Sequence, residues 1–593
     1  MRLLISIVFS LLFCLSVFSQ TEDLAESYFN EGDYGKSLLT YQKLYEKEKK
    51  QKYFLRVIDC HRQLEQLNEA EGLLLEKLEQ RKSLTYTIEL GYNYQLKKDT
   101  LNANLNYEKA IEGVRENPAF TFSAARRFEK HVLLDQAART YELGMKLKPN
   151  SNYTIQLARI YGEQARFEKM FNSYLGYVER KPNYIDNIKR IFSQFITEDK
   201  SQENNVSLRK ALLKRIQSNP NLLWNQLLSW LFVQQKEYEK SFAQEKAIYK
   251  RQMQSLESIV DLAIITIDED ENEMAKEILE FVIANSQESE MILEAHQLQL
   301  TLDTKNAVDN KDYKSIDERY KMLFQDFGRG QQTLDLQVAY AHFLAFYLND
   351  TETAISFLKD TLKIQLAPLE ESKVKIELGD ILVFEEKFNE ALIYYSQIQY
   401  KVKNSVLSQK ARFKVAKTSY YKGDFNWAES QLKILKKSTS QLTANDALDL
   451  KLLISDNRNE DSLQTALKLY SKADLLAFQN RTDESINLLD QVLEAHKTET
   501  IVDQALLKQA QLFEKQKEYL KAEANYLRII ADFKDDILVD DAYYHLAELY
   551  ANHLDQIDKA KEFYEKIIFE HADSIYFVES RKKFRLLRGD DIN

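Results

Sequence analysis

The chain has 593 residues, of which 44% are hydrophobic and 11% aromatic, so most of it can fold around an apolar core. Its 13 glycines and 5 prolines are too few for an all-β fold or for an α/β fold with glycine-rich loops, which leaves helices joined by short turns. The formal net charge of −11, dispersed along the chain, disfavours nucleic-acid binding, which requires a clustered basic face.

The first predicted element is an export signal. Residues 1–19, MRLLISIVFSLLFCLSVFS, combine one arginine, an apolar run and small residues, and we expect cleavage after about Ser19. The alternative is an uncleaved anchor. Lipidation of Cys14 is disfavoured, because Phe13 stands where a lipoprotein signal has a small residue. No later apolar run is long enough to span a membrane, and after cleavage Cys60 has no cysteine with which to form an internal disulfide.

A repeating unit of about 34 residues follows. Gly91 is followed twelve residues later by Ala103, and Pro118 closes this unit. The next units repeat the same steps, with a spacing of 33 residues from Ala125 to Ala158. Within each half of a unit, apolar residues fall at i, i+3, i+4 and i+7, which predicts two amphipathic helices per unit.

The predicted turn between the two helices lies at Gly32–Tyr34 and again at Gly423–Phe425. Gly can adopt a left-handed conformation that ends the first helix, and the following Asp can cap the second. We expect the small residues to sit where the two helices cross, and tyrosines and phenylalanines to fill the space beside them.

This order of small, aromatic and small residues, with a closing proline, resembles the tetratricopeptide (TPR) repeat. The resemblance implies an all-α, right-handed superhelical solenoid of roughly 14–16 antiparallel helix pairs. The alternative is an unrelated helical bundle. The residues that define the repeat are Gly91, Ala103, Ala125, Ala137, Ala158, Gly379, Ala391, Ala416, Ala428, Ala510 and Ala522.

The period divides the chain into several predicted parts. An N-terminal TPR array covers 20–185, an irregular helical joint 186–220, a central TPR-like array 221–400, and a C-terminal TPR array 401–593 with a divergent helical insert near 438–466. The C-terminal repeats are similar to TPR units of exported Gram-negative envelope proteins. This similarity implies a periplasmic location or one peripheral to the outer membrane.

No catalytic constellation is found. The closest glycine pair, Gly328 and Gly330, lacks the Lys-Ser/Thr of a phosphate loop, and the acidic run from Asp268 lacks the glycine of a calcium loop. The eight histidines show no metal-binding spacing. We therefore expect no enzyme activity, no cofactor and no metal.

A solenoid offers a long concave face that can receive an extended peptide or a partner protein. The register places Tyr92, Arg126, Arg159 and Lys417 on this face as candidate partner-binding residues; the alternative is that each is a surface residue without a partner. TPR proteins that grip C-terminal carboxylates have Lys and Asn where this chain has acidic residues at 22 and 26, so that clamp is absent.

The sequence thus predicts a non-enzymatic interaction scaffold of the bacterial periplasm or outer envelope, which binds protein partners or extended peptides. The alternative is an accessory factor for cell-wall glycan or outer-membrane protein assembly. A line of exposed aromatic residues along the groove would favour glycan, whereas charged and small polar residues would favour protein. A hidden enzyme domain would need a non-helical segment of about 100 residues, and no such segment is present.

Overall fold

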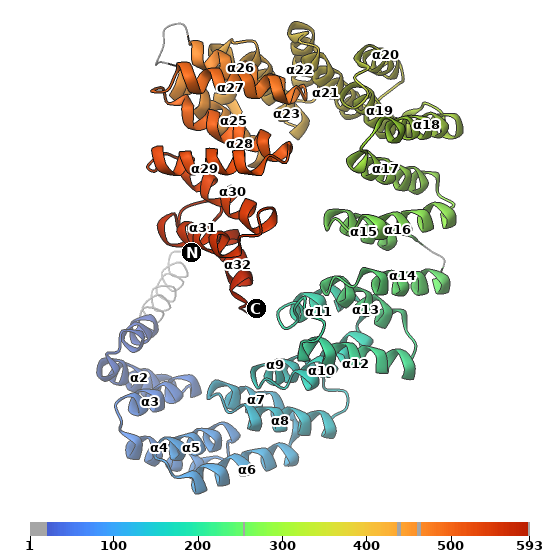
Figure 1. Cartoon of the computed structure of the whole chain (residues 1–593). Helices are drawn as coiled ribbons and strands as arrows, with labels where there is room; N and C mark the ends of the chain where they lie inside the picture. The colour runs from blue at the N-terminus through green and yellow to red at the C-terminus, as the bar shows by residue number, and fades with distance from the viewer. Residues whose placement is uncertain (1–20, 253–254, 436–440, 459–463, 591–593) are drawn as a thin grey trace, which may run out of the picture. The chain divides into compact units, whose positions relative to one another are not determined.

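The computed structural model describes residues 21–252, 255–435, 441–458 and 464–590 (Figure 1). These residues form 32 α-helices, counting the segment 21–30, together with three short 3-10 helices and no strand. The prediction of an all-α solenoid of paired helices is confirmed. The predicted signal at 1–19 lies outside the described residues.

The chain divides into two compact units, with the boundary between Gln244 and Glu245. The N-terminal unit begins with the helix at 21–30. It continues with α2 (Tyr34–Glu48), α3 (Gln51–Gln63), α4 (Leu67–Gln80), α5 (Leu84–Leu96), α6 (Thr100–Glu116), α7 (Thr121–Lys130), α8 (Leu134–Leu147), α9 (Thr154–Glu163), α10 (Phe167–Arg180), α11 (Ile185–Phe192), α12 (Glu203–Ser218), α13 (Leu222–Gln234) and the start of α14 (Tyr238–Gln252).

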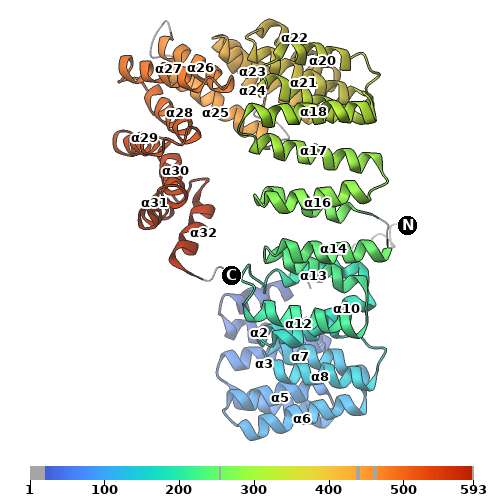
Figure 2. The same cartoon turned by 45° about the vertical axis from the view of Figure 1, so that its right-hand side comes forward.

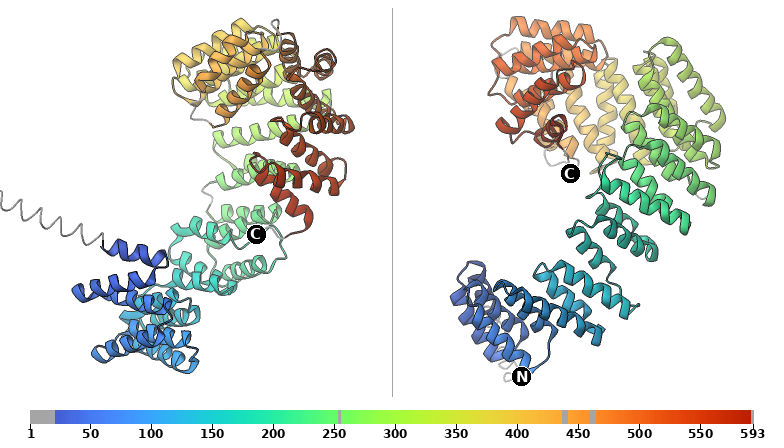
Figure 3. Two further views of the ribbon diagram at one scale, coloured as in Figure 1. Left: turned by 90° about the vertical axis from the view of Figure 1, so that its left-hand side faces the viewer. Right: turned by 60° about the horizontal axis from the view of Figure 1, so that its bottom comes forward.

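The C-terminal unit is built in the same way from helices that alternate in direction. They are α15 (Glu257–Asp268), α16 (Asn272–Asn285), α17 (Ser289–Asn306), α18 (Asn310–Phe327), α19 (Leu334–Phe346), α20 (Thr351–Thr361), α21 (Pro368–Phe384), α22 (Phe388–Lys401), α23 (Val406–Tyr421), α24 (Phe425–Leu435), α25 (Gln441–Asn457), α26 (Thr465–Phe478), α27 (Thr482–Ala495), α28 (Ile501–Lys515), α29 (Tyr519–Asp532), α30 (Val539–Asn552), α31 (Ile557–Glu570) and α32 (Phe577–Arg588). Figure 2 and Figure 3 show the pairs stacked side by side within each unit.

Helix pairs cross where the small residues lie. All eleven repeat-defining residues are buried. A Cβ atom added to Gly91 would lie 2.6 Å from Cε1 of Tyr107, and one added to Gly379 would meet the ring of Tyr395. Each tyrosine ring therefore occupies the space that a larger side chain on the facing helix would need.

The turn inside each pair uses the left-handed conformation. Gly32 and Gly423 both have φ of 82°, and Asp33 accepts a hydrogen bond from the backbone N–H of Lys36 at 3.2 Å. The predicted roles of Gly and Asp in these turns are confirmed. Most other pairs place a non-glycine residue at the same position, seven residues after the small one. With φ between 53° and 63°, these are Lys98, Val132, Ala165, Lys236, Asp270, Glu386, Asn480 and Lys517.

The two segments where the repeat pattern slips differ in structure. In the predicted joint, the short helix α11 is followed by a loop that the buried Asn205 holds, because its side chain donates to the carbonyl oxygens of Thr197 at 2.7 Å and Asp199 at 2.6 Å. In the divergent insert near 438–466, α25 is a helix, whereas residues 438–440 and 459–463 lie outside the described residues. No helix in the described part of the chain is long and apolar enough to cross a membrane.

The crossing geometry predicts the effect of enlarging a small residue. Ala137 and Ala428 are fully buried, so Ala137→Leu or Ala428→Leu must push two backbones apart. We expect each to lower the free energy of unfolding by about 1–3 kcal/mol, measured by urea unfolding with circular dichroism. Lys109→Leu, on the exposed side of α6, is the control and should change little. Unchanged unfolding in both alanine variants would contradict the crossing register.

The turn geometry predicts a stabilising substitution. Val132 is β-branched, 74% exposed and left-handed, with φ of 56°, a conformation that costs about 1–2 kcal/mol for most residues. Val132→Gly removes that strain, and we expect a gain of about 1 kcal/mol in the free energy of unfolding. Leu105→Gly, at an exposed site inside α6, should instead lose about 1 kcal/mol. Equal losses in both variants would show that Val132 carries no strain.

Candidate partner-binding site

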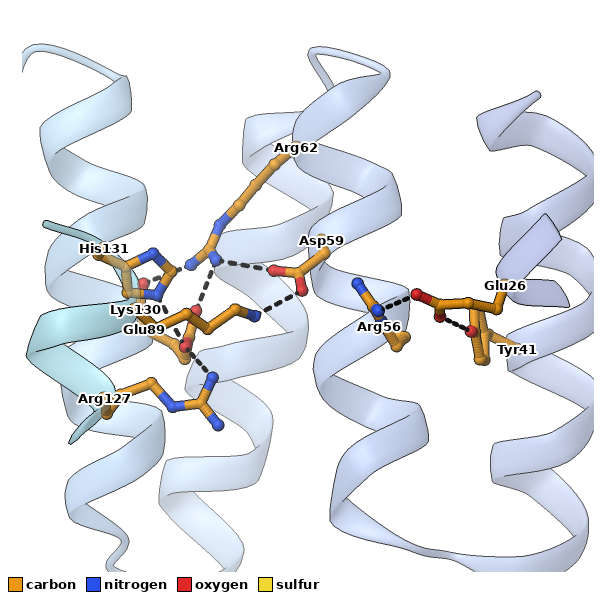
Figure 4. A network of polar contacts seen from close by, with 9 residues as sticks. All are labelled: Glu26, Tyr41, Arg56, Asp59, Arg62, Glu89, Arg127, Lys130 and His131. Carbon is orange, nitrogen blue, oxygen red and sulfur yellow. Dashed lines mark hydrogen bonds and ion pairs between the residues drawn. The ribbon is translucent and has the colours of Figure 1, made fainter. Parts of the chain in front are cut away.

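The first helices of successive pairs form one face of the N-terminal unit, which we call the inner face. It curves strongly, because Nζ of Lys130 on α7 lies 2.8 Å from Oδ2 of Asp59 on α3, although α5 stands between these helices in the order of pairs (Figure 4). Helices in contact are about 8–10 Å apart, so a flat array would hold α3 and α7 out of reach of each other. The inner face is therefore concave.

The residue directly after the small residue of a first helix points toward this face, and we call it the inner position. In several pairs it is a carboxylate with two partners. Glu26 accepts a hydrogen bond from Tyr41 of its own pair at 2.6 Å and forms an ion pair with Arg56 of the next pair (Figure 4). In the C-terminal unit, Asp380 likewise accepts from Tyr395 at 2.5 Å and pairs with Lys414 at 2.6 Å.

The same arrangement recurs near the end of the chain. Glu548 accepts from Tyr564 and pairs with Lys583 at 2.6 Å, and Asp474 pairs with Lys508 at 2.7 Å. These contacts form a ladder in which an acid of one pair meets a base of the next first helix. The ladder links neighbouring pairs and neutralises the charges at the inner position.

The inner position changes residue type in the middle of the N-terminal unit, where the acid that meets the next first helix lies elsewhere on its own helix, as Glu129 does when it pairs with Arg159. At the inner positions of α5, α7 and α9 the carboxylate is replaced by Tyr92, Arg126 and Arg159. The structure therefore brings three of the four predicted partner-binding residues onto consecutive first helices. Lys417 lies in the other unit, where it pairs with Asp474 at 2.6 Å as part of the ladder.

Asp474 shows how strongly the bases of the ladder can stabilise an ionised carboxylate. Burial alone would raise the pKa of its carboxyl group, but the ammonium groups of Lys417 and Lys508 lower that pKa to about 2. Lys417 thus balances a buried carboxylate in α26. The partner-binding candidates that remain together are the three in the N-terminal unit.

A buried network lies beneath Tyr92. Glu89 is 1% exposed; its carboxylate accepts from Arg62 at 2.5 Å and is paired with Arg127 at 3.0 Å and His131 at 2.9 Å (Figure 4). Arg62 also donates to the backbone carbonyl of Glu89 at 2.6 Å. The ring of Tyr92 stacks on His131 with centroids 3.9 Å apart. This network fastens α3, α5 and α7 together.

The cations dominate the electrostatics of Glu89. Burial would raise the pKa of its carboxyl group, but the hydrogen bond from His131 and the charges of Arg62 and Arg127 hold that pKa well below its ordinary value. Glu89 is therefore ionised in the folded protein at neutral pH.

Arg126 and Arg159 share the carboxylate of Glu129, and Arg159 also lies 3.7 Å from Glu163. Glu129 pairs with Arg126 at 3.2 Å and also with Arg159, while its other oxygen accepts from Tyr141 at 2.8 Å. The two arginine side chains are 54% and 50% exposed. They line a hollow of about 260 Å³ together with Phe122, Ile155 and Gln156.

A second hollow, of about 330 Å³, lies on the other side of α7. Its basic lining residues are Lys52, Arg56, Arg127 and Lys130, and its acidic ones are Glu22, Glu26 and Asp59. Glu22 is neutralised by Lys52 at 2.5 Å and accepts from Tyr53 at 2.8 Å. The positions of a C-terminal carboxylate clamp are thus occupied by acids that are already paired.

Sequence reasoning missed Arg62, Glu89, Arg127, Lys130 and His131. One signal was available, because Arg127, Lys130 and His131 are spaced i, i+3 and i+4 and so share one side of a helix. The partners of these bases lie 27–71 residues away, too far for a local pattern to identify them.

The charge of the chain is unevenly distributed, contrary to the dispersed balance expected from the total. Residues 21–244 contain 35 Lys and Arg and 30 Asp and Glu, which gives a formal net charge of +5. Residues 245–593 contain 45 Lys and Arg and 62 Asp and Glu, which gives a net charge of −17. Among the described residues, no group of three or more His, Cys, Asp or Glu is arranged to hold a metal ion.

Comparisons with known proteins agree with the repeat assignment. A tetratricopeptide repeat model matches residues 541–574, in α30 and α31. No curated protein matches the chain. Similar solved structures include Naa15/Naa10 bound to HypK-THB, with 14% identity, coverage of 96% of this chain and 92% of that one, and a TM-score of 0.32.

Two further structures are similar at this level. The P58(IPK) TPR domain has 13% identity, coverage of 65% and 93%, and a TM-score of 0.19. The APC/C hetero-tetramer Cut9–Hcn1 has 13% identity, coverage of 92% and 98%, and a TM-score of 0.24. At these identities the likeness concerns the fold alone.

The buried network predicts a large and pH-dependent effect of Glu89→Gln. Removing the carboxylate leaves buried cations uncompensated, and we expect a loss of about 3 kcal/mol in the free energy of unfolding at neutral pH. Because the folded pKa is depressed, Glu89 stabilises the protein above its unfolded pKa of about 4.3 and loses this effect as the pH falls. The difference between wild type and variant, measured by urea unfolding, should therefore narrow below about pH 4.

Glu112→Gln provides the matched control. Glu112 pairs with Arg115 at 2.9 Å, and both side chains are 58% exposed, so this change should stay within about 0.5 kcal/mol at either pH. A difference for Glu89→Gln that stays constant from neutral to acidic pH would contradict the assigned charge state.

Proposed function

We propose that this protein is a non-enzymatic scaffold of the bacterial periplasm or outer envelope, and that it holds an extended segment of a partner protein on the inner face of its N-terminal unit. An α-helical repeat solenoid with a TPR repeat offers an extended surface for protein–protein interaction. The partner is held in fixed geometry and is released unchanged.

The observation that carries this proposal is the replacement of the inner-position carboxylate by Arg126 and Arg159. Where that carboxylate is present, the inner position is neutralised within the protein, as Asp380 is by Lys414. At Arg126 and Arg159 two half-exposed guanidinium groups share one carboxylate beside Phe122, which is itself 48% exposed. Exposed arginine and aromatic side chains in a concave site are typical of residues that dominate binding energy at protein interfaces.

The envelope location is supported by two features of the sequence. The first is the apolar segment at 1–19 with its predicted cleavage after Ser19, and the second is the similarity of the C-terminal repeats to those of envelope proteins. Charge rather than a line of exposed aromatic rings characterises the inner face of the N-terminal unit. This favours a protein over a wall glycan as the partner.

The proposal is tested by affinity capture from the native cell envelope. The bait is the full-length gene product, compared with Arg126→Glu/Arg159→Glu and with the charge-matched control Arg115→Glu/Arg139→Glu, which changes exposed arginines on the second helices α6 and α8. We expect one reproducible partner with the wild type and the control, and its loss from the double variant at the inner face. N-terminal sequencing of the recovered bait should begin at Gln20.

Two results would count against the proposal. Retention of the same partner by both double variants would remove the inner face from the interaction. Recovery of wall polymer without any protein would replace the scaffold with the glycan-associated alternative. Circular dichroism of each variant establishes that its helices are intact before capture.

A further inference from the structure

We infer that the hollow between α7 and α9 binds a carboxylate side chain from an acidic, extended segment of the partner, with an apolar neighbour of that side chain packed on Phe122. This inference rests on the proposed function, because it specifies the chemistry that the inner face recognises. The lining of the hollow, Phe122, Arg126, Ile155, Gln156 and Arg159, comes from two consecutive first helices.

The size of the hollow fits a side chain. Its volume of about 260 Å³ lies below the range of about 300–1,000 Å³ that is typical of pockets for drug-sized ligands. Phe122 and Ile155 provide an apolar wall, and the two guanidinium groups provide the polar part. A ligand with one carboxylate next to one apolar group fits this combination of a basic part and an apolar wall.

The two arginines at the hollow have more N–H donors than their acidic partners use, although Glu129 and Glu163, 3.7 Å from Arg159, balance their formal charge. Each arginine carries five N–H donors, and the contacts to Glu129 use one nitrogen of Arg126 and one of Arg159. Glu129 is 10% exposed and also accepts from Tyr141, so its own oxygens are fully engaged. A carboxylate entering from solvent would find unused donors on both arginines, and it would compete with the exposed Glu163 for Arg159.

The second hollow indicates why the bound segment is extended. The two hollows flank α7, because Arg126 lines one of them whereas Arg127 and Lys130 line the other. A chain that crosses α7 in extended form presents alternate side chains at regular intervals to the same surface. Acidic side chains at such intervals meet bases in both hollows.

Charge complementarity also separates an acidic segment from other anions. The N-terminal unit has a net charge of +5, but its inner face interleaves acids with the bases, as Asp59 and Glu163 do beside Lys130 and Arg159. A nucleic-acid backbone needs a continuous basic track and would meet these carboxylates. A peptide whose carboxylates are separated by apolar residues can place its charges on the bases without meeting the acids of the inner face.

The test uses synthetic peptides of alternating Glu and Phe with an amidated C-terminus, and matched peptides in which Gln or Lys replaces Glu. Binding to the full chain is followed by fluorescence anisotropy. We expect the Glu–Phe peptide to bind at least tenfold more tightly than the Gln–Phe peptide, and more weakly as salt is raised. Arg126→Gln/Arg159→Gln should weaken binding at least tenfold, while Arg115→Gln/Arg139→Gln should leave it unchanged.

Several results would overturn the inference. Equal binding of the Glu–Phe and Gln–Phe peptides, or no binding of the Glu–Phe peptide up to about 1 mM, would exclude a carboxylate subsite. Binding of a Glu–Phe peptide with a free C-terminus but not of the amidated one would assign the site to a chain-terminal carboxylate instead. To guard against misfolding, Arg126→Glu/Arg159→Glu is tested with the Lys–Phe peptide, which it should bind more tightly than the wild type does.

The two proposals fail separately. If affinity capture shows a partner that depends on the inner face while the peptides do not discriminate by charge, the scaffold stands and the carboxylate subsite is wrong. If the peptides discriminate but no cellular partner is recovered, the subsite stands and the scaffold role in the envelope is wrong.

Discussion

The structure depends on one steric constraint, the crossing of two helices over a residue without a large side chain. At Gly91 and Gly379 the facing tyrosine ring lies where a Cβ would be, so the separation of the two helices is set by that ring. The position of this crossing also determines which residues of the first helix point toward the inner face. In the pairs of Tyr41 and Tyr395, the residue after the small one reaches the inner face, and the tyrosine that fills the crossing donates its hydroxyl hydrogen to that residue. The contacts of Tyr41 with Glu26 and of Tyr395 with Asp380 therefore have the same origin.

The ion-pair ladder contributes to arrangement more than to stability. Apart from the buried Asp474, its members are partly exposed, and such pairs are worth about 0.2–1 kcal/mol each, whereas burial of a core side chain contributes about 1.5–3 kcal/mol. Apolar packing between pairs does not by itself fix their relative orientation. A charged contact between successive first helices favours one orientation. The Glu89 network differs because it is buried, and there the loss of one partner is far more costly than for an exposed pair.

The sequence was sufficient for the helix pairs, because a small residue followed by another twelve residues later is a local pattern. It was insufficient for most turns, since Val132 and Ala165 adopt a conformation that their residue types disfavour, and only the packing of the flanking helices requires it. The inner-face residues Tyr92, Arg126 and Arg159 follow from register alone. Their partners do not, because the contact of Lys130 with Asp59 across 71 residues depends on the curvature that accumulates over several pairs.

The arginines at the inner position and the Glu89 network together explain why a binding surface would form at this place. Arg126 and Arg159 at the inner position have more N–H donors than their contacts with Glu129 and Glu163 use, and these donors remain for a ligand. Such donors bind well only if the helices that carry them are already fixed, since ordering them on binding would reduce the affinity. Arg62, Arg127 and His131 converge on Glu89 and hold α3, α5 and α7 in place before any partner arrives. The buried charges thus keep the exposed ones preorganised.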